Sequence, residues 1–236
     1  MRLRDCANEA ALVYYRGQGD RRELGTTLNW LGAVACEQGD FAHALPWLEE
    51  GLSLLRGGDN PQALGFALYH LGKACHALGD LVRARSLLEE SVAVFRHGGV
   101  TAMLADQSLA NLGEVIEELG DDARAGSMYR EALTDLSRIE DRLNVASLLE
   151  SFASLAAKAG QPVRACRLIG AADRLHEEIH SPRSLASSPR HARTWQLAGR
   201  QLAPEIAEAE LAAGRRMTWP EAVAYALAEG GGESAD

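Results

Sequence analysis

The sequence is poor in aromatic residues and contains no long apolar run. Phe, Trp and Tyr make up only 6% of its 236 residues. A membrane-spanning helix needs about 20 consecutive apolar residues, and no stretch approaches that length. Residues 1–20 also lack the continuous apolar core of a signal peptide. These absences predict a cytoplasmic protein that does not contact membranes.

Paired cysteines and an excess of basic residues are lacking as well. Four cysteines are scattered along the chain without a CxxC pair: Cys6, Cys36, Cys75 and Cys166. This usage is typical of reduced cysteines that serve as small core residues. The formal net charge is −9, whereas binding to a nucleic-acid backbone requires clustered Lys and Arg. We therefore expect no direct nucleic-acid partner.

Motifs for nucleotide or hydrolytic chemistry are also missing. The only Gly-Lys step, Gly72-Lys73, is followed by Ala74, and Ala67 stands where a Walker A loop begins with glycine. Neither a nucleophile elbow nor a Ser/His/Asp set is recognisable. The sequence thus predicts a non-enzymatic protein with no catalytic residue and no cofactor.

One short motif has a metal-binding alternative. Residues 176–180 read HEEIH and satisfy HExxH, in which two histidines on one helical face bind zinc. The metzincin continuation fails, because Arg183 and Ala186 replace its Gly and third His, and Ser181-Pro182 ends the helix at once. We predict no metal site here; a zinc hydrolase and adventitious metal binding are the alternatives.

What the sequence does contain is a pattern that recurs about every 40 residues. Its clearest copy comprises Leu71-Gly72, Gly79-Asp80, Ala84, Leu88 and Ser91. Other copies begin at Leu31-Gly32, at Leu112-Gly113 and, more weakly, at Phe152-Ala153. Fixed self-similarity at this spacing indicates a stacked array of structural repeats.

Each copy is interpreted as two antiparallel helices. Gly72 and Ala84 should lie where the helices cross, Gly79 should end the first helix, and Asp80 should cap the second. These positions resemble the tetratricopeptide repeat (TPR). The period exceeds the usual TPR unit of about 34 residues and approaches the roughly 40–47 of HEAT and armadillo units, so HEAT-like packing is the alternative. Six framework positions should be buried: Leu31, Leu71, Leu112, Ala44, Ala84 and Ala125.

The expected fold class is all-α, a TPR-like right-handed superhelix of antiparallel helix pairs with a C-terminal helical cap. We expect residues 1–20 to supply the second helix of an incomplete leading repeat, 21–180 four repeats, 181–229 capping helices and 230–236 a disordered tail. The four pairs are predicted at 21–38 with 41–56, 61–78 with 81–97, 102–119 with 122–138, and 141–159 with 162–179. Residues 218–221 (TWPE) fit a capping box for a final helix.

The leading helix has an apolar face that includes Leu12, Val13 and Tyr14. A repeat array normally ends in a polar capping face. Either these side chains pack only on the next repeat, or the chain is a piece of a longer protein or forms a homodimer through this end. We favour the second interpretation.

Two segments near the C-terminus carry a more specific resemblance. RLIGAADRLHEEI (167–179) and AGRRMTWPEAVAYALAE (213–229) resemble the C-terminal repeat region of LuxR-type and maltose-activator-like transcriptional regulators and of NB-ARC-type signal-transduction ATPases. Pro204 departs from that pattern. The resemblance implies a sensor or autoinhibitory array that acts on an ATPase or DNA-binding part elsewhere in the same regulator.

The first helix of each repeat lines the concave face of a TPR array, so its surface positions are the expected binding groove. The predicted partner-binding residues are Asn29, Phe66, Tyr69, Lys73, His76, Gln107, Glu114, Glu117 and Glu150. Phe66 and Tyr69 share one helical face and offer aromatic area of the kind that dominates recognition. The glutamates of the third repeat should face Lys73 and His76 as an acidic wall. The simplest alternative is a solvated face that binds nothing.

These expectations favour a non-enzymatic interaction or sensor module of a bacterial transcriptional or signalling regulator. Its concave face would bind a protein segment or a small ligand, and an amphipathic helix or a cationic segment would suit the groove. The alternative is a stand-alone assembly scaffold, homodimeric or not, without a regulatory switch.

Overall fold

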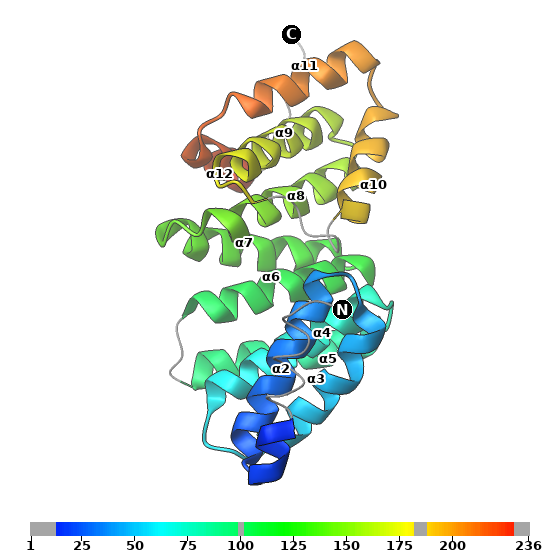
Figure 1. Cartoon of the computed structure of the whole chain (residues 1–236). Helices are drawn as coiled ribbons and strands as arrows, with labels where there is room; N and C mark the ends of the chain where they lie inside the picture. Colours follow the sequence, from blue (N-terminus) through cyan, green and yellow to red (C-terminus); the bar gives the residue numbers. More distant parts are fainter. Residues whose placement is uncertain (1–12, 99–101, 182–187, 229–236) are drawn as a thin grey trace. The chain divides into compact units, whose positions relative to one another are not determined.

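A computed structural model describes residues 13–98, 102–181 and 188–228, and every regular element within these ranges is an α-helix (Figure 1). The helices are α2 (Arg21–Glu37), α3 (Phe41–Leu55), α4 (Pro61–Ala77), α5 (Leu81–His97), α6 (Ala102–Glu118), α7 (Asp122–Arg138), α8 (Arg142–Lys158), α9 (Pro162–Glu178), α10 (Ser188–Gly199), α11 (Pro204–Arg215) and α12 (Trp219–Leu227). The predicted all-α class is confirmed. Of these helices, none is long and apolar enough to cross a membrane.

The helix boundaries follow from local turn chemistry. Gly39, Gly79, Gly120 and Gly160 all have positive φ angles, which glycine adopts without steric cost. After Gly39 and Gly79 the next residue, an aspartate, caps the following helix: the carboxylate of Asp80, for example, accepts a hydrogen bond from the Arg83 amide at 3.2 Å. The Gly-Asp steps at 39–40, 79–80 and 120–121 lie between one helix and the next, as predicted, whereas at the fourth turn Gly160 is followed by Gln161, which makes no side-chain capping hydrogen bond.

Small residues lie where paired helices cross. The Cβ that a side chain would add at Gly72 would approach Leu88 Cγ to 2.8 Å, and Gly32 is similarly close to Leu48. The six framework positions predicted to be buried are all buried. Cys36, Cys75 and Cys166 are also buried and free, and burial raises the pKa of the Cys36 thiol to about 11.

The chain divides into two compact units, Met1–Asp121 and Asp122–Asp236. The first contains α2 to α6 and the second α7 to α12. The boundary falls between the two helices of the third predicted pair, whereas the repeat pattern led us to treat the array as one domain.

The second unit closes with three shorter helices. α10 ends at Gly199 and α11 begins with Pro204 at its first turn. α11 packs against α9 at a point where Gly170 and Gly214 bring the two backbones into contact. Thr218 and Glu221 form the predicted capping box of α12.

Some predictions concern the chain ends. Residues 13–18 are helical, and Val13 and Tyr14 are 74% and 60% exposed. The rest of the leading helix, with Leu12, and the tail at 230–236 lie outside the described residues. Dimerisation through the leading helix stays a prediction.

Candidate functional site

α4 carries four of the nine predicted partner-binding residues. Asn60 caps this helix by accepting a hydrogen bond from the Ala63 amide at 3.0 Å, and Pro61 occupies its first turn. The helix runs without interruption to Ala77. Residues spaced three or four apart along it therefore share one face.

An aromatic cluster lies on this face of α4 and extends to α2. Phe66 packs edge-on against Phe95, with ring centroids 5.6 Å apart, and lies 6.4 Å from Trp30 of α2. His70 stacks on Phe66 at 6.1 Å and meets the edge of Tyr69 at 5.0 Å. Phe95 is buried, whereas Trp30 is 60% exposed. The cluster therefore joins the core to the surface.

Lys73 borders the cluster. Its ammonium group lies 5.4 Å from the Tyr69 ring centroid and 3.4 Å from Glu37 Oε1 on α2. Its charge interaction with Tyr69, and then that with Glu37, raises the pKa of Lys73 above its ordinary value. Burial, together with the Lys73 charge, lowers the pKa of His70 to about 3. His70 is therefore neutral at physiological pH. We call Trp30, Phe66, Tyr69, His70 and Lys73 the aromatic surface.

The contacts between α4 and α6 differ from those expected. His76 Nε2 lies 3.3 Å from Glu118 Oε1, and Asn111 donates a hydrogen bond to the Tyr69 hydroxyl at 3.4 Å. Glu118 occupies the repeat position of Glu37, and Glu117, one residue earlier, is only 3% exposed. The acidic partner of His76 is thus Glu118, and the predicted exposure of Glu117 was wrong.

Three predicted residues are buried. Besides Glu117, they are Asn29 and Glu150. Asn29 is a residue of α2, and its Oδ1 has no hydrogen-bond partner among the residues the structure describes. Because these three side chains are buried, they are not accessible to a partner in this conformation of the chain. Gln107 and Glu114 are partly exposed, so they stay predicted contact residues.

Sequence reasoning missed Trp30 and His70. Both occupy the repeat position that directly precedes the Leu-Gly pair. The predicted groove positions included the residue just before each of them, Asn29 and Tyr69, and not these two. An aromatic residue at the same position of two successive repeats was a signal that could have identified them.

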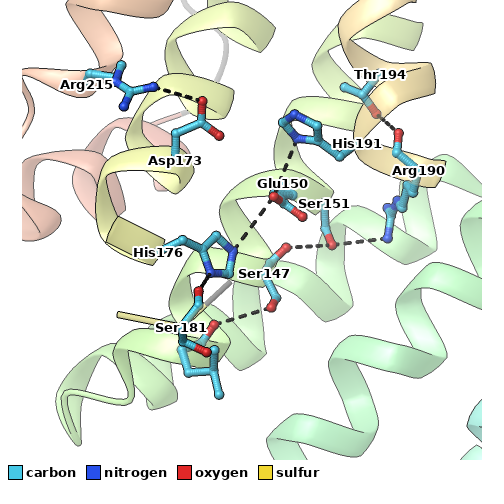
Figure 2. A network of polar contacts seen from close by, with 11 residues as sticks. Ser147, Glu150, Ser151, Asp173, His176, Ser181, Arg190, His191, Thr194 and Arg215 are labelled. Atoms are coloured by element: carbon cyan, nitrogen blue, oxygen red, sulfur yellow. Dashed lines mark hydrogen bonds and ion pairs between the residues drawn. The ribbon is translucent and has the colours of Figure 1, made fainter. Parts of the chain in front are cut away.

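Glu150 belongs to a separate buried cluster in the second unit (Figure 2). Its Oε1 lies 3.8 Å from His176 Nε2 on α9 and 3.5 Å from His191 Nδ1 on α10. His176 Nδ1 lies 3.1 Å from the Ser181 carbonyl, which can only accept, so this nitrogen carries the hydrogen. His176 Nε2 then faces Glu150 as a donor only when the imidazole is protonated.

The HExxH motif does not form a zinc-binding face. α9 ends at Glu178, and His180 lies beyond it with a φ of 52°, so the two histidines of the motif are not on one helical face. In the described parts of the chain, no group of three or more His, Cys, Asp or Glu side chains is arranged to hold a metal ion.

Comparison with known proteins agrees with this architecture. Residues 23–97 match the tetratricopeptide repeat family model. No curated protein matches the chain in sequence. The structure is similar to that of BtubC (BKLC) from P. vanneervenii, with a TM-score of 0.64 and 18% identity over 89% of this chain and 88% of that one. It also resembles a putative kinesin light chain with nearly identical TPR-like repeats from Podosopora anserina, with a TM-score of 0.54 and 18% identity over 80% and 92% of the two chains.

The helix pairs and the comparisons define the class of protein: an all-α array of TPR-like repeats. Within it, the segment at 23–97 is similar to the tetratricopeptide repeat in sequence as well as in fold. Arrays of this class generally serve as protein-interaction modules.

Proposed function

We propose that the chain is a non-enzymatic interaction module whose aromatic surface binds a segment of another protein. The observation that carries the proposal is the exposure of Trp30 at 60% beside the aromatic cluster of α4, in which Phe66 lies 6.4 Å from it. Exposed aromatic residues on a rigid, packed base are the usual anchors of protein recognition.

The charges of the aromatic surface favour an apolar anchor. Lys73 is paired with Glu37 at 3.4 Å, and His70 is neutral because its pKa is about 3. Little net charge is left on the surface itself. An amphipathic helix that presents its apolar face therefore suits it better than a strongly charged segment.

We further propose that this interaction module is part of a larger regulator. The resemblance of 167–179 and 213–229 to the repeat regions of LuxR-type regulators and NB-ARC-type ATPases supports a role as the sensor part of such a regulator. Co-purification with the product of an adjacent reading frame that encodes an ATPase or a DNA-binding domain would test this. Neighbouring genes of unrelated type would count against it.

The binding function is tested by selecting short displayed peptides on the wild-type chain and titrating the selected peptide against variants. Trp30→Ser and Tyr69→Ala should each weaken binding by about 2 kcal/mol, or roughly thirtyfold in Kd. The matched control is Val82→Ser on α5, since Val82 is 67% exposed and lies in the same unit. Equal affinity of all four proteins, with their helical circular dichroism unchanged, would refute the proposed surface.

A further inference from the structure

α12 is a nine-residue amphipathic helix that packs on α7, α8 and α9 of the second unit (Figure 1). The side chains that it buries are small: Ala222, Val223 and Ala226. Its two aromatic residues, Trp219 and Tyr225, stay partly exposed. Apolar burial alone therefore holds α12 only weakly.

Arginines from the repeats hold the aromatic residues of α12. The guanidinium group of Arg142, at the start of α8, lies 5.5 Å from the Trp219 ring centroid. That of Arg164, on α9, lies 5.3 Å from the Tyr225 ring centroid. Both distances are those of cation–π interactions.

Two arginines also hold the last turn of α12. Arg164 Nη2 donates hydrogen bonds to the carbonyls of Ala226 at 2.9 Å and Ala228 at 2.8 Å, and Arg130 Nη1 of α7 donates to that of Leu227 at 2.7 Å. The C-terminal end of a helix carries a partial negative charge. Two cations therefore converge on the end of α12 that attracts them.

This arrangement resembles that of a receptor holding a helical ligand. The aromatic contacts hold Trp219 and Tyr225 of the helix, and the guanidinium groups of Arg130 and Arg164 bind the free carbonyls at its C-terminal end. The bonds from arginine to main-chain carbonyls have one charged partner, whereas a bond to a carboxylate has two and can be bidentate, which makes it stronger. A helix that ends in a carboxylate would therefore bind these arginines better than α12 does.

We propose that Arg130, Arg142 and Arg164 form a second binding site, which takes a short amphipathic helix ending in a free C-terminal carboxylate. In the structure α12 occupies this site as an internal competitor. Tethering gives α12 an effective concentration in the millimolar range, so an external helix must displace it. This site is independent of the aromatic surface.

The test uses the full chain and a labelled peptide with the sequence of residues 218–228 and a free carboxylate. Val223→Asp should release α12, because it places a charge at a buried position, while all three arginines stay intact. The peptide should bind this opened variant at least about tenfold more tightly than wild type. The same peptide with an amidated C-terminus should bind the opened variant several-fold more weakly than the free acid.

Two further variants assign the binding to the arginines. Arg164→Ala in the opened variant should weaken peptide binding at least about tenfold. Arg200→Ala, which removes an exposed arginine of the same unit, should leave it unchanged. Compared with wild type, the opened variant should exchange amide hydrogens faster in α12 and at the same rate in α8 and α9.

Equal peptide affinity for the opened variant and wild type, with α8 and α9 still protected, would overturn the proposal. If Val223→Asp also exposes α8 and α9 to exchange, the peptide titration and the hydrogen-exchange measurement are repeated with the milder Trp219→Ser variant. Loss of protection of α8 and α9 in both variants would show that α12 is a structural cap and would equally overturn it.

Discussion

Gly214 and Gly170 allow α11 and α9 to cross with their backbones in contact. A Cβ at Gly214 would overlap the carbonyl oxygen of Arg167, and a backbone atom cannot rotate away as a side chain does. Gly214→Ala should therefore push the two helices apart and lower the free energy of unfolding of the second unit by about 1–3 kcal/mol or more, measured by urea denaturation.

The control for this substitution is another helical glycine of the same unit. A Cβ at Gly126 would meet Leu155 Cδ1 at 3.5 Å, an ordinary contact. Gly126→Ala should be neutral or stabilising by up to about 1 kcal/mol, since alanine is the better helix former. Similar effects of the two substitutions would contradict the role given to the close crossing.

His70 makes the stability of the first unit depend on pH. Burial and the Lys73 charge lower its pKa from 6.5 to about 3. The unfolded chain therefore binds a proton below about pH 6.5 that the folded chain does not bind, and stability is lost as the pH falls from about 6.5 towards 3. At pH 5 this group alone removes at most about 2 kcal/mol.

Comparison with His70→Phe measures this effect, because phenylalanine keeps a ring in the cluster and removes the titration. The unfolding free energy of wild type should fall by up to about 2 kcal/mol more than that of the variant between neutral pH and about pH 5. A constant difference between the two proteins across this range would mean that His70 is solvated and titrates normally.

At the scale of single helices, the position where α9 ends argues against zinc binding by the HExxH motif at 176–180. His180 lies past the helix end with a positive φ, so it cannot join His176 on one helical face. A chelator should leave the melting temperature unchanged, and metal analysis should find no stoichiometric zinc. One tightly bound zinc per chain that is lost in His180→Ala would contradict this account.

The helices could be predicted from the sequence because their signals are local. A Gly-Asp step such as Gly79-Asp80 both ends a helix and caps the next one, so the predicted boundaries lie within a residue or two of those found for α2 to α9. The mode of α12 docking could not be predicted in this way, since its arginine contacts come from residues far away in the sequence.

The candidate site was harder to predict than the helices. A shift of one residue turns a side chain by about 100° around a helix, which is why Glu118 rather than Glu117 faces His76. One neighbour of the buried Glu150 is His191, which α10 brings to it from outside the repeats. By contrast, the sequence could place four predicted residues on one face of a helix because all of them belong to α4: Phe66, Tyr69, Lys73 and His76.

At the scale of the whole molecule, the chain consists of two compact units, and we have proposed one ligand-binding surface on each. The aromatic surface belongs to the first unit and the site occupied by α12 to the second. Variants in one unit should therefore leave the ligand affinity of the other unchanged.

The central claim is that a partner covers the aromatic surface, and hydroxyl-radical footprinting of Trp30 tests it most directly. Trp30 and Tyr14 are equally exposed, at 60%, and both belong to the first unit. On addition of the selected peptide, oxidation of Trp30 should fall several-fold while that of Tyr14 stays the same. Unchanged oxidation of Trp30 at saturating peptide, with protection of Tyr14 or of residues in the second unit, would contradict the account.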